Sequence, residues 1–474
     1  MTFLGLRATD DLALIDAETG SRRTYRELLS AAERAADLLG EGKALVFLSA
    51  QNDIASVTTF LATQLAGHAV ALLDGTMPTE RHVRLIRHYR PDRIVAPRGM
   101  ADQLRSAGME VDVLGEVEGH EVVTDRSPVA ADRIHPSLAL MLGTSASTGS
   151  KKYVRLSLRN IETNARAIAG YLGLTRSDRP MTSLPIHYTF GLSVLTSHWA
   201  VGAAMILTGE SVIRPSFWEM VREHASTSIA GVPYTYQMLE RIGYREMDLP
   251  SVRLMQQAGG ALDRHLTRVY ADHMAARGGR FFVMYGQTEA TARMTYVPPE
   301  RLADKIGSAG IAIAEGALTI DTQTPGSGPG AGEVVYRGPN VMLGYVTRPE
   351  DLAQGDELGG ILRTGDIGYL DADGFLFLTG RSKRIAKVTG RRVNLDEVET
   401  LLREHGPAAV VADDDVILGF CAFDGGVSLD DIRIAVARQL RIHRTAIELR
   451  QVLDLPISTS GKIDYTEVER WLSH

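Results

Sequence analysis

The chain has 474 residues, of which 44% are hydrophobic, enough to bury sizeable cores in about two to four domains at ~150 residues each. Its 58 acidic and 51 basic side chains are dispersed and give a formal charge of −7, which leaves no basic footprint for nucleic acid. The single cysteine, Cys421, excludes an internal disulfide framework and a multi-cysteine metal site.

The N-terminus carries neither a secretory nor a transit pattern. Asp10 and Asp11 come before any apolar stretch of signal-peptide length, and no run of ~18 apolar residues follows elsewhere. We therefore expect a cytoplasmic protein without a membrane span.

The first half of the chain alternates between helical and strand patterns. Thr24 and Glu27 form a capping box at the start of an amphipathic helix over residues 24–39. Strands separated by helices of this length predict a parallel sheet with crossover helices. The expected strands are Ala44–Leu48, Ala69–Leu73, Arg93–Ala96 and Leu138–Leu142, and the expected helices between and after them are Ile54–Ala66, Glu80–Tyr89 and Leu156–Tyr171.

From about residue 311 the pattern changes to short β-type runs punctuated by Gly and Pro. Asp371-Ala-Asp-Gly374 predicts a hairpin turn within this part. The tail after Arg381 mixes short strands with helices at Leu395–Glu404 and Ser428–Gln439, which suits one small α+β domain.

The segment Gly143–Tyr153 gathers hydroxyls, small residues and two lysines in one polar turn after the apolar run Leu138–Leu142. Backbone N–H groups, hydroxyls and a lysine are the donors that wrap phosphoryl oxygens. The glycines lie too far apart for the common P-loop. Phosphate binding and an ordinary polar loop both remain open from this segment alone.

Five further residues carry possible chemistry. Tyr285 ends an apolar strand and offers a flat ring to a purine, while Thr288 and Glu289 offer a hydroxyl and a ligand for Mg²⁺; the alternative is a helix start capped by Thr288. Asp366 offers a carboxylate, and acidic residues commonly accept hydrogen bonds from ribose hydroxyls in nucleotide sites. Lys462 lies in a polar turn, where a lysine is ordinarily a surface residue.

Residues 380–393 contain six basic side chains among fourteen and no acid. A solvated basic hairpin explains this pattern as well as a binding role does.

Taken together and in this order, these segments resemble the adenylate-forming superfamily of acyl-CoA and aryl-CoA synthetases, firefly-type luciferases and peptide-synthetase adenylation domains. The resemblance covers nearly the whole chain. It rests on Thr24-Tyr25-x-Glu27-Leu28, the loop at 144–152, Leu184-Pro185 with Gly191-Leu192, Ala258-Gly259-Gly260, Tyr285-Gly286-Gln287-Thr288-Glu289, Gly332-Glu333 with Arg337-Gly338 and Gly344-Tyr345, Thr364-Gly365-Asp366, Gly380-Arg381 and Ser460-Gly461-Lys462.

The resemblance implies an α/β fold. Its large N-terminal domain, residues 1–380, has αβ-layered sheets and a distorted β-barrel subdomain from about residue 311. A hinge at residues 381–383, with Lys383 as the hinge residue, leads to a small mobile α+β domain at 384–474.

The resemblance also implies roles for individual residues. The catalytic set is Lys462, Thr288, Glu289 and Lys152, with Glu289 on Mg²⁺. The nucleotide and CoA contacts are Thr144, Ser145, Ser147, Thr148, Gly149, Ala258, Gly259, Gly260, Tyr285, Gly286, Asp366, Arg381 and Gly390. The acyl pocket is lined by His187, Tyr188, Phe190, Tyr234 and Ala292 together with Gly259.

Several positions depart from the family pattern. Ala146 and Tyr153 stand where glycine is usual, and Lys151 stands where proline is usual, so Lys152 is the residue that matches the family lysine. Tyr188 takes the usual histidine position, with His187 one residue earlier. The phosphate loop and the chemistry near the carboxylate are therefore expected to differ from those of relatives.

The function implied is ATP-dependent activation of a small aromatic or polar carboxylic acid as acyl-AMP, followed by transfer to a thiol, with CoA the expected co-substrate. Transfer to a carrier protein or an amine, adenylation of an unusual oxyanion, and a non-catalytic nucleotide-binding role are the alternatives.

Overall fold

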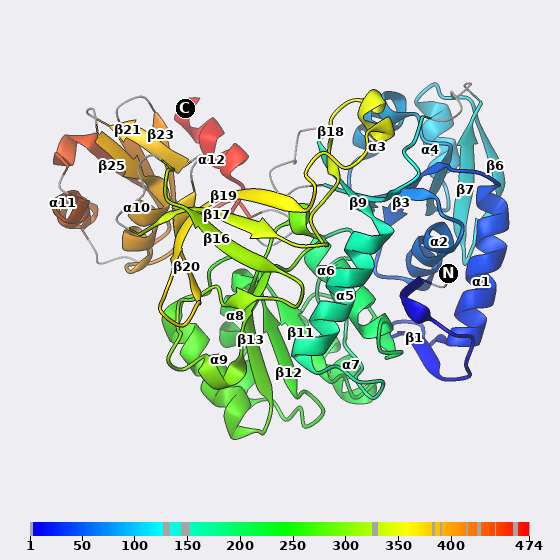
Figure 1. The fold of residues 1–474 in the computed structure, drawn as a ribbon, viewed down its shortest axis with the longest axis horizontal. Coiled ribbons are helices and arrows are strands. Elements are labelled where there is room, and N and C mark those ends of the chain that lie inside the picture. The colour runs from blue at the N-terminus through cyan, green and yellow to red at the C-terminus, as the bar shows by residue number, and fades with distance from the viewer. Residues whose placement is uncertain are drawn as a thin grey trace. The chain divides into compact units, whose positions relative to one another are not determined.

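The structure is a computed structural model, and it describes residues 3–126, 133–143, 152–324, 330–381, 384–388, 391–413, 416–423, 428–440, 442–457 and 463–473 (Figure 1). The chain divides into two compact units. Unit 1 contains residues 1–306, 312–317 and 337–362, and unit 2 contains residues 307–311, 318–336 and 363–474.

An eight-stranded sheet is the centre of unit 1. Its strand order is β18-β9-β8-β4-β3-β5-β7-β6. The strands are β3 (Leu45–Ala50), β4 (Ala69–Asp74), β5 (Arg93–Pro97), β6 (Val111–Val117), β7 (His120–Asp125), β8 (Leu138–Gly143), β9 (Tyr153–Ser157) and β18 (Gly344–Val346).

Two smaller sheets complete unit 1. One has the order β10-β1-β2 and the other β11-β12-β13-β14-β15. Their strands are β1 (Leu12–Asp16), β2 (Arg22–Thr24), β10 (Met205–Leu207), β11 (Ser228–Gly231), β12 (Leu254–Gln257), β13 (Arg280–Tyr285), β14 (Thr295–Val297) and β15 (Ile311–Ala312).

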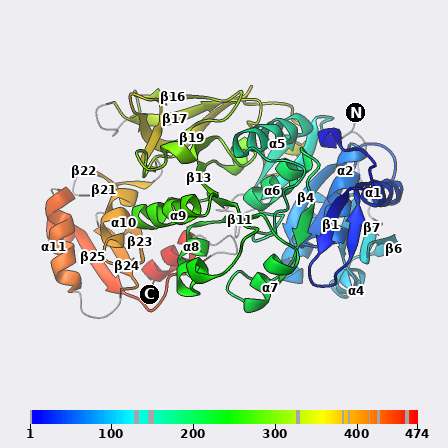
Figure 2. The same ribbon diagram turned by 90° about the horizontal axis from the view of Figure 1, so that it is seen from below.

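The helices of unit 1 connect these strands, and Figures 1 and 2 show α5 lying beside α6. They are α1 (Tyr25–Leu39), α2 (Ile54–Leu65), α3 (Thr79–Tyr89), α4 (Met100–Ser106), α5 (Leu158–Leu172), α6 (Thr189–Trp199), α7 (Pro215–Glu223), α8 (Pro233–Arg241) and α9 (Arg264–Ala276).

The predicted parallel sheet is confirmed at its centre. Strand β3 pairs in parallel with both β4 and β5, and β4 pairs in parallel with β8. Alternate residues of β3 enter two different cores: Val46 and Leu48 belong to one, Leu45 and Phe47 to the other. Both faces of the sheet are therefore buried, which explains the continuous apolar runs.

The capping box is also confirmed. The Glu27 amide donates to Thr24 Oγ1 over 3.2 Å, and the Thr24 amide donates to the Glu27 carboxylate over 2.8 Å.

The prediction of a helix from Leu156 was wrong at its start. Residues 153–157 form β9, which pairs antiparallel with β8, and the helix begins at Leu158 with Ser157 as its cap. Tyr153 packs in the core, where its ring meets that of Tyr89 edge-on. The residue that replaces the usual glycine therefore serves packing.

Unit 2 holds most of the strands of the predicted β-rich segment, together with the tail. The first forms a four-stranded sheet, β16-β17-β19-β20, which is open rather than a closed barrel in the part that the structure describes. Its strands are β16 (Ala317–Asp321), β17 (Gly332–Arg337), β19 (Ile361–Leu370) and β20 (Leu376–Arg381). The predicted turn at Asp371 joins β19 to β20, and the Gly374 amide donates to the Asp371 carbonyl.

The tail has the two predicted helices, α10 (Leu395–Arg403) and α11 (Leu429–Leu440), followed by α12 (Tyr465–Arg470). The basic segment forms the antiparallel pair β21 (Ile385–Val388) and β22 (Arg391–Asn394). A further sheet consists of β23 (Ala408–Asp413), β24 (Val416–Cys421) and β25 (Ile447–Gln451). The mixed α/β fold class is thus confirmed. The predicted hinge includes residues 382–383, which lie outside the described part of the chain, so the hinge stays a prediction.

Candidate active site

A lysine, a tyrosine and a glutamate meet at the β18–β9 edge of the large sheet. Lys152 Nζ lies 3.5 Å from the centroid of the Tyr345 ring. The Tyr345 hydroxyl donates to Glu289 Oε1 over 2.8 Å. Burial, together with the adjacent Glu289 charge, raises the pKa of Tyr345, so the phenol stays a neutral donor. This Lys152–Tyr345–Glu289 cluster brings together two residues that lie far apart in the sequence and a tyrosine that links them.

Thr288 and Glu289 belong to a 3₁₀ turn over Thr288–Ala290, and Gln287 occupies its cap position. The alternative of a helix capped by Thr288 is therefore wrong. Thr288 Oγ1 lies 3.0 Å from Thr189 Oγ1 at the start of α6, and the Glu289 carbonyl accepts from the Met342 amide over 2.9 Å. Contacts from two other segments hold both residues in place.

Position 286 has no room for a side chain, so only glycine fits there. A Cβ atom placed on it would lie 1.7 Å from the Ala292 carbonyl oxygen. Ala292 itself has φ 97°, and the preceding Thr291 has φ 54°. Asn340 holds this unusual turn, since its side chain donates to the Ala290 carbonyl and its own carbonyl accepts from Thr291 Oγ1. The backbone strain therefore lies beside Tyr285 and the predicted nucleotide contacts.

The Ala258–Gly260 segment lies at the same sheet edge as Tyr285. It follows β12, which pairs in parallel with β13, the strand that ends in Tyr285. Gln257 Nε2 donates to the Gly260 carbonyl over 2.8 Å and fixes the turn. The carboxyl ends of two parallel strands thus supply the predicted adenine contacts together.

The predicted acyl-pocket residues differ in their surroundings. His187 Nε2 lies 3.9 Å from Asp74 Oδ2, and burial lowers the pKa of His187 although Asp74 acts in the opposite direction. Burial raises the pKa of Tyr188 to about 12. Phe190 is buried, whereas Tyr234 is 40% exposed. Three of these side chains lie at or just before the N-terminal end of α6.

Sequence reasoning missed Arg293 and gave Tyr345, Thr189 and Asn340 no role. Arg293 is almost completely buried, and its Cζ lies 4.8 Å from the centroid of the Phe190 ring. A charged residue in the apolar segment that follows Glu289 was the available signal for Arg293. Asn340 and Tyr345 gave only a weak signal, because they approach the site from a segment about fifty residues further on.

In unit 2, Asp366 and Arg381 face each other across the β19–β20 pair. Arg381 Nε donates to Asp366 Oδ1 over 3.0 Å; the Asp366 side chain is 6% exposed and that of Arg381 is 63% exposed. Gly365, at φ 72°, donates its amide to Glu333 and shapes the turn before Asp366. The two predicted ribose contacts are therefore neighbours.

The remaining predicted residues lie outside the described part of the chain. These are Thr144, Ser145, Ser147, Thr148, Gly149, Lys383, Gly390 and Lys462, together with Ala146 and Lys151.

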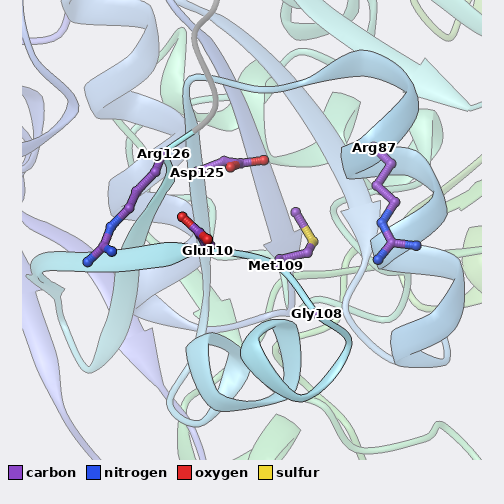
Figure 3. Close-up of a pocket in the computed structure, with 6 residues that line it drawn as sticks. All are labelled: Arg87, Gly108, Met109, Glu110, Asp125 and Arg126. Carbon is purple, nitrogen blue, oxygen red and sulfur yellow. The ribbon is translucent and has the colours of Figure 1, made fainter.

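A surface cavity of about 290 Å³ lies elsewhere in unit 1. It is lined by Gly108, Met109, Glu110, Asp125, Arg126 and Arg87, and Figure 3 shows the two arginines at its opposite sides. Its residues belong to α3, the end of β7 and the segment leading into β6, whereas the Lys152–Tyr345–Glu289 cluster lies at the other edge of the sheet. The cavity contains none of the predicted site residues.

Within the described ranges, no three His, Cys, Asp or Glu side chains are grouped so that they could hold a metal ion by themselves. In the same ranges, no helix has the length and apolar character needed to cross a bilayer.

Residues 6–346 match the family model described as AMP-binding enzyme. The chain belongs to this family. The match includes the Lys152–Tyr345–Glu289 cluster, Thr288 and the predicted acyl pocket, and it confirms the resemblance to adenylate-forming enzymes. Asp366, Arg381 and Lys462 lie beyond the matched residues.

Two CoA ligases and one solved structure align over most of the chain. Sulfoacetate–CoA ligase of Cupriavidus necator is 28% identical and aligns over 76% of this chain and 74% of its own length. Oxalate–CoA ligase of Arabidopsis thaliana is 29% identical over 69% of this chain and 66% of its own length. The o-succinylbenzoate coenzyme A synthetase of Bacillus subtilis, in complex with ATP and magnesium ion, has the same fold, with a TM-score of 0.78 at 22% identity over 99% of both chains.

Proposed function

We propose that this protein is an AMP-forming acid–thiol ligase that activates a carboxylic acid with ATP and transfers the acyl group to CoA. In the first step a carboxylate oxygen attacks the α-phosphorus, the bond to the bridging oxygen breaks, and pyrophosphate leaves. In the second step the CoA thiolate attacks the acyl carbonyl and AMP leaves. The observation that carries the proposal is the Lys152–Tyr345–Glu289 cluster next to Thr288.

The cluster suits the electrostatics of the first step. A carboxylate and a triphosphate repel each other, so the site must neutralise charge where they meet. Lys152 supplies a positive charge for the β- and γ-phosphates, and the Thr288 hydroxyl supplies a donor for the α-phosphate. Thr144, Ser145, Ser147, Thr148 and Gly149 are assigned to the phosphates in the same proposal. No general base is needed, because the nucleophile is already ionised.

Glu289 fits the binding of Mg²⁺. Its Oε1 accepts from Tyr345, while Oε2 accepts no hydrogen bond in the described part of the chain. Mg²⁺ in proteins usually takes one or two carboxylates together with substrate phosphates, so a single oriented carboxylate is sufficient. The ion would neutralise charge on the phosphates.

The nucleoside contacts are assigned from the resemblance to the family, residue by residue. In unit 1, Tyr285, Gly286 and the Ala258–Gly260 backbone would hold the adenine. In unit 2, Asp366 would accept from the ribose hydroxyls with Arg381 beside it, a task common to acidic residues in nucleotide sites.

The tail of the chain is assigned to the change between the two steps. Lys462 would bridge the attacking carboxylate and the α-phosphate. Rotation of residues 384–474 about Lys383 would then withdraw Lys462 and bring Gly390 toward the pantetheine thiol. One site would thus serve two reactions with different electrostatic needs.

The acid is proposed to be small and aromatic or polar. His187, Tyr188, Phe190 and Ala292 give the pocket rings and polar atoms rather than a long apolar channel. The names of two relatives point the same way, since sulfoacetate and oxalate are small acids that each carry a second acidic group.

A panel of carboxylic acids tests the proposal. We expect acid-dependent exchange of labelled pyrophosphate into ATP, and release of AMP when CoA is added. Lys462→Ala should abolish the exchange, and unchanged exchange would remove Lys462 from the adenylation step. Lys43→Ala, which removes a lysine that donates to backbone carbonyls near β8, is the control for the loss of a lysine.

The same assay separates the alternatives. If AMP release requires a carrier protein or an amine instead of CoA, that molecule is the acceptor of the second step, and the proposed first step stands. Exchange supported only by an oxyanion other than a carboxylate would change the substrate class. Binding of ATP in calorimetry without exchange or AMP release for any acid would overturn the ligase and favour a nucleotide-binding role.

A further inference from the structure

Arg293 is a buried cation that lacks a counter-ion among the described residues. The residue is 1% exposed. Its Nη1 lies 3.1 Å from both the Tyr171 hydroxyl and Met284 Sδ. Its Nε and Nη2 are buried and meet no hydrogen-bond partner in the described part of the chain. Nη1 of the guanidinium group thus contacts the protein. The edge formed by Nε and Nη2 has two N–H groups without an acceptor in the described part of the chain.

The backbone fixes where this arginine lies. The Arg293 carbonyl accepts from the side chains of Asn164 on α5 and Asn340, over 2.8 and 3.2 Å. Its side chain contacts α5 through Tyr171, α6 through Phe190 and β13 through Met284. The guanidinium group therefore lies among three elements of unit 1 and not at its surface.

Nearby ionisable groups do not neutralise Arg293. Burial, with Arg293 among the nearby charges, lowers the pKa of His198 to about 4, so His198 is uncharged at neutral pH. Asp178, the carboxylate that acts electrostatically on His198, pairs with Arg253 at 2.8 Å. A buried charge without a partner is costly, and such a group is suited to an anion that arrives with a ligand.

Arg293 is linked to the proposed reaction centre through α6. Its guanidinium group packs on Phe190, the residue that follows Thr189, and Thr189 contacts Thr288. Thr288 is the proposed partner of the α-phosphate. These two contacts connect Arg293 to the segment proposed to bind the reacting acid.

We propose that Arg293 binds a second anionic group of the acid substrate, a carboxylate or a sulfonate, through its Nε–Nη2 edge. The inference rests on the proposed function and narrows its substrate class to acids with two negative charges. The geometry of that edge matches a planar carboxylate, which accepts two parallel hydrogen bonds from a guanidinium group. Arg293 is then a specificity-determining residue.

Matched pairs of substrates test this inference. Each short dicarboxylic acid, such as malonate, succinate or phthalate, is compared with its monomethyl ester in pyrophosphate exchange. We expect the best diacid to exceed its ester at least ~10-fold in kcat/KM, as charge-assisted hydrogen bonds allow. Arg293→Met should bring this ratio to about 1 by raising KM for the diacid. Arg293→Lys should keep part of the ratio, because lysine retains the positive charge but cannot donate two parallel hydrogen bonds to a carboxylate.

Thermal unfolding distinguishes a binding role of Arg293 from a purely structural one. Arg293→Met replaces an unpaired buried charge with an apolar side chain, so we expect an unchanged or raised Tm. Arg166→Met, on the exposed side of α5, is the control because Arg166 pairs with Glu162 and is 57% exposed. A strongly lowered Tm in Arg293→Met, with rates for diacid and ester reduced equally, would overturn the inference.

The two proposals can fail separately. Pyrophosphate exchange that only monocarboxylic acids support, at the same rate in the wild type and in Arg293→Met, would overturn the second anion site. The proposed ligase function would stand. If no acid supports exchange, the ligase fails, and the site is then judged by thermal stabilisation with succinate and its monomethyl ester. Stabilisation of the wild type by succinate alone, lost in Arg293→Met, would support the anion site, and equal effects on both proteins would overturn it.

Discussion

The Tyr345 hydroxyl donates a hydrogen bond to Glu289 Oε1 over 2.8 Å, while Lys152 lies against the Tyr345 ring. Tyr345 therefore orients the proposed Mg²⁺ ligand and supports the proposed phosphate lysine at the same time. It is a positioning residue, because both effects act through its neighbours.

Tyr345→Phe keeps the ring beneath Lys152 and removes only the hydroxyl. We expect kcat/KM for pyrophosphate exchange to fall about 10-fold, as the loss of one hydrogen bond to a charged group implies, and the Mg²⁺ concentration for half-maximal rate to rise. Tyr369→Phe, on the exposed part of β19, is the matched control. An unaltered Mg²⁺ dependence in Tyr345→Phe would show that the hydroxyl does not orient Glu289.

Gly286→Ala should be strongly destabilising, because the new Cβ would lie 1.7 Å from the Ala292 carbonyl. Forced backbone movement of this kind typically costs about 1–3 kcal/mol. In contrast, Gly170→Ala places its Cβ in open space on helix α5 and should stabilise by about 0.5–1 kcal/mol. Thermal or urea unfolding of both variants measures the difference, and equal stability would contradict the close approach.

Asp366→Asn should weaken ATP binding without unfolding the protein. The Asp366 side chain is 6% exposed, but its partner Arg381 is 63% exposed. Solvent therefore screens the ion pair, and we expect it to contribute about 1 kcal/mol. A carboxylate that accepts from ribose contributes more, so we expect KM for ATP to rise about 10-fold or more while KM for the acid changes little. Asp373→Asn in the neighbouring hairpin turn is the control. A lowered Tm with an unchanged KM for ATP would assign Asp366 to stability instead.

His198 should make stability depend on pH. Burial lowers its pKa from 6.5 to about 4, so between these values the unfolded chain binds a proton that the folded protein does not. The free energy of unfolding must therefore decrease as the pH falls from 6.5 toward 4, by up to about 3 kcal/mol from this residue, and not change further below that range. Chemical unfolding of wild type and His198→Asn across this range measures the contribution, and parallel curves would show that His198 does not remain neutral in the folded protein.

The sequence by itself predicted the elements whose pattern is local. Thr24 and Glu27 cap a helix through neighbouring groups, and strands such as β3 and β4 are apolar because both of their faces are buried. The residues of the Tyr285–Glu289 and Thr364–Asp366 segments were also identifiable, because each motif is contiguous and occurs in the family order.

Only the tertiary structure decided which distant residues complete the site. Tyr345 reaches Glu289 because β18 pairs with β9 at the sheet edge, next to Lys152, and this pairing joins residues nearly two hundred positions apart. The sequence marked Arg293 only as a charged residue in an apolar segment. Its proposed role depends on burial among α5, α6 and β13, and on the absence of a carboxylate partner in the described residues. A one-dimensional pattern records residue types and spacing, whereas the free energy of a buried charge depends on the groups that the fold places around it.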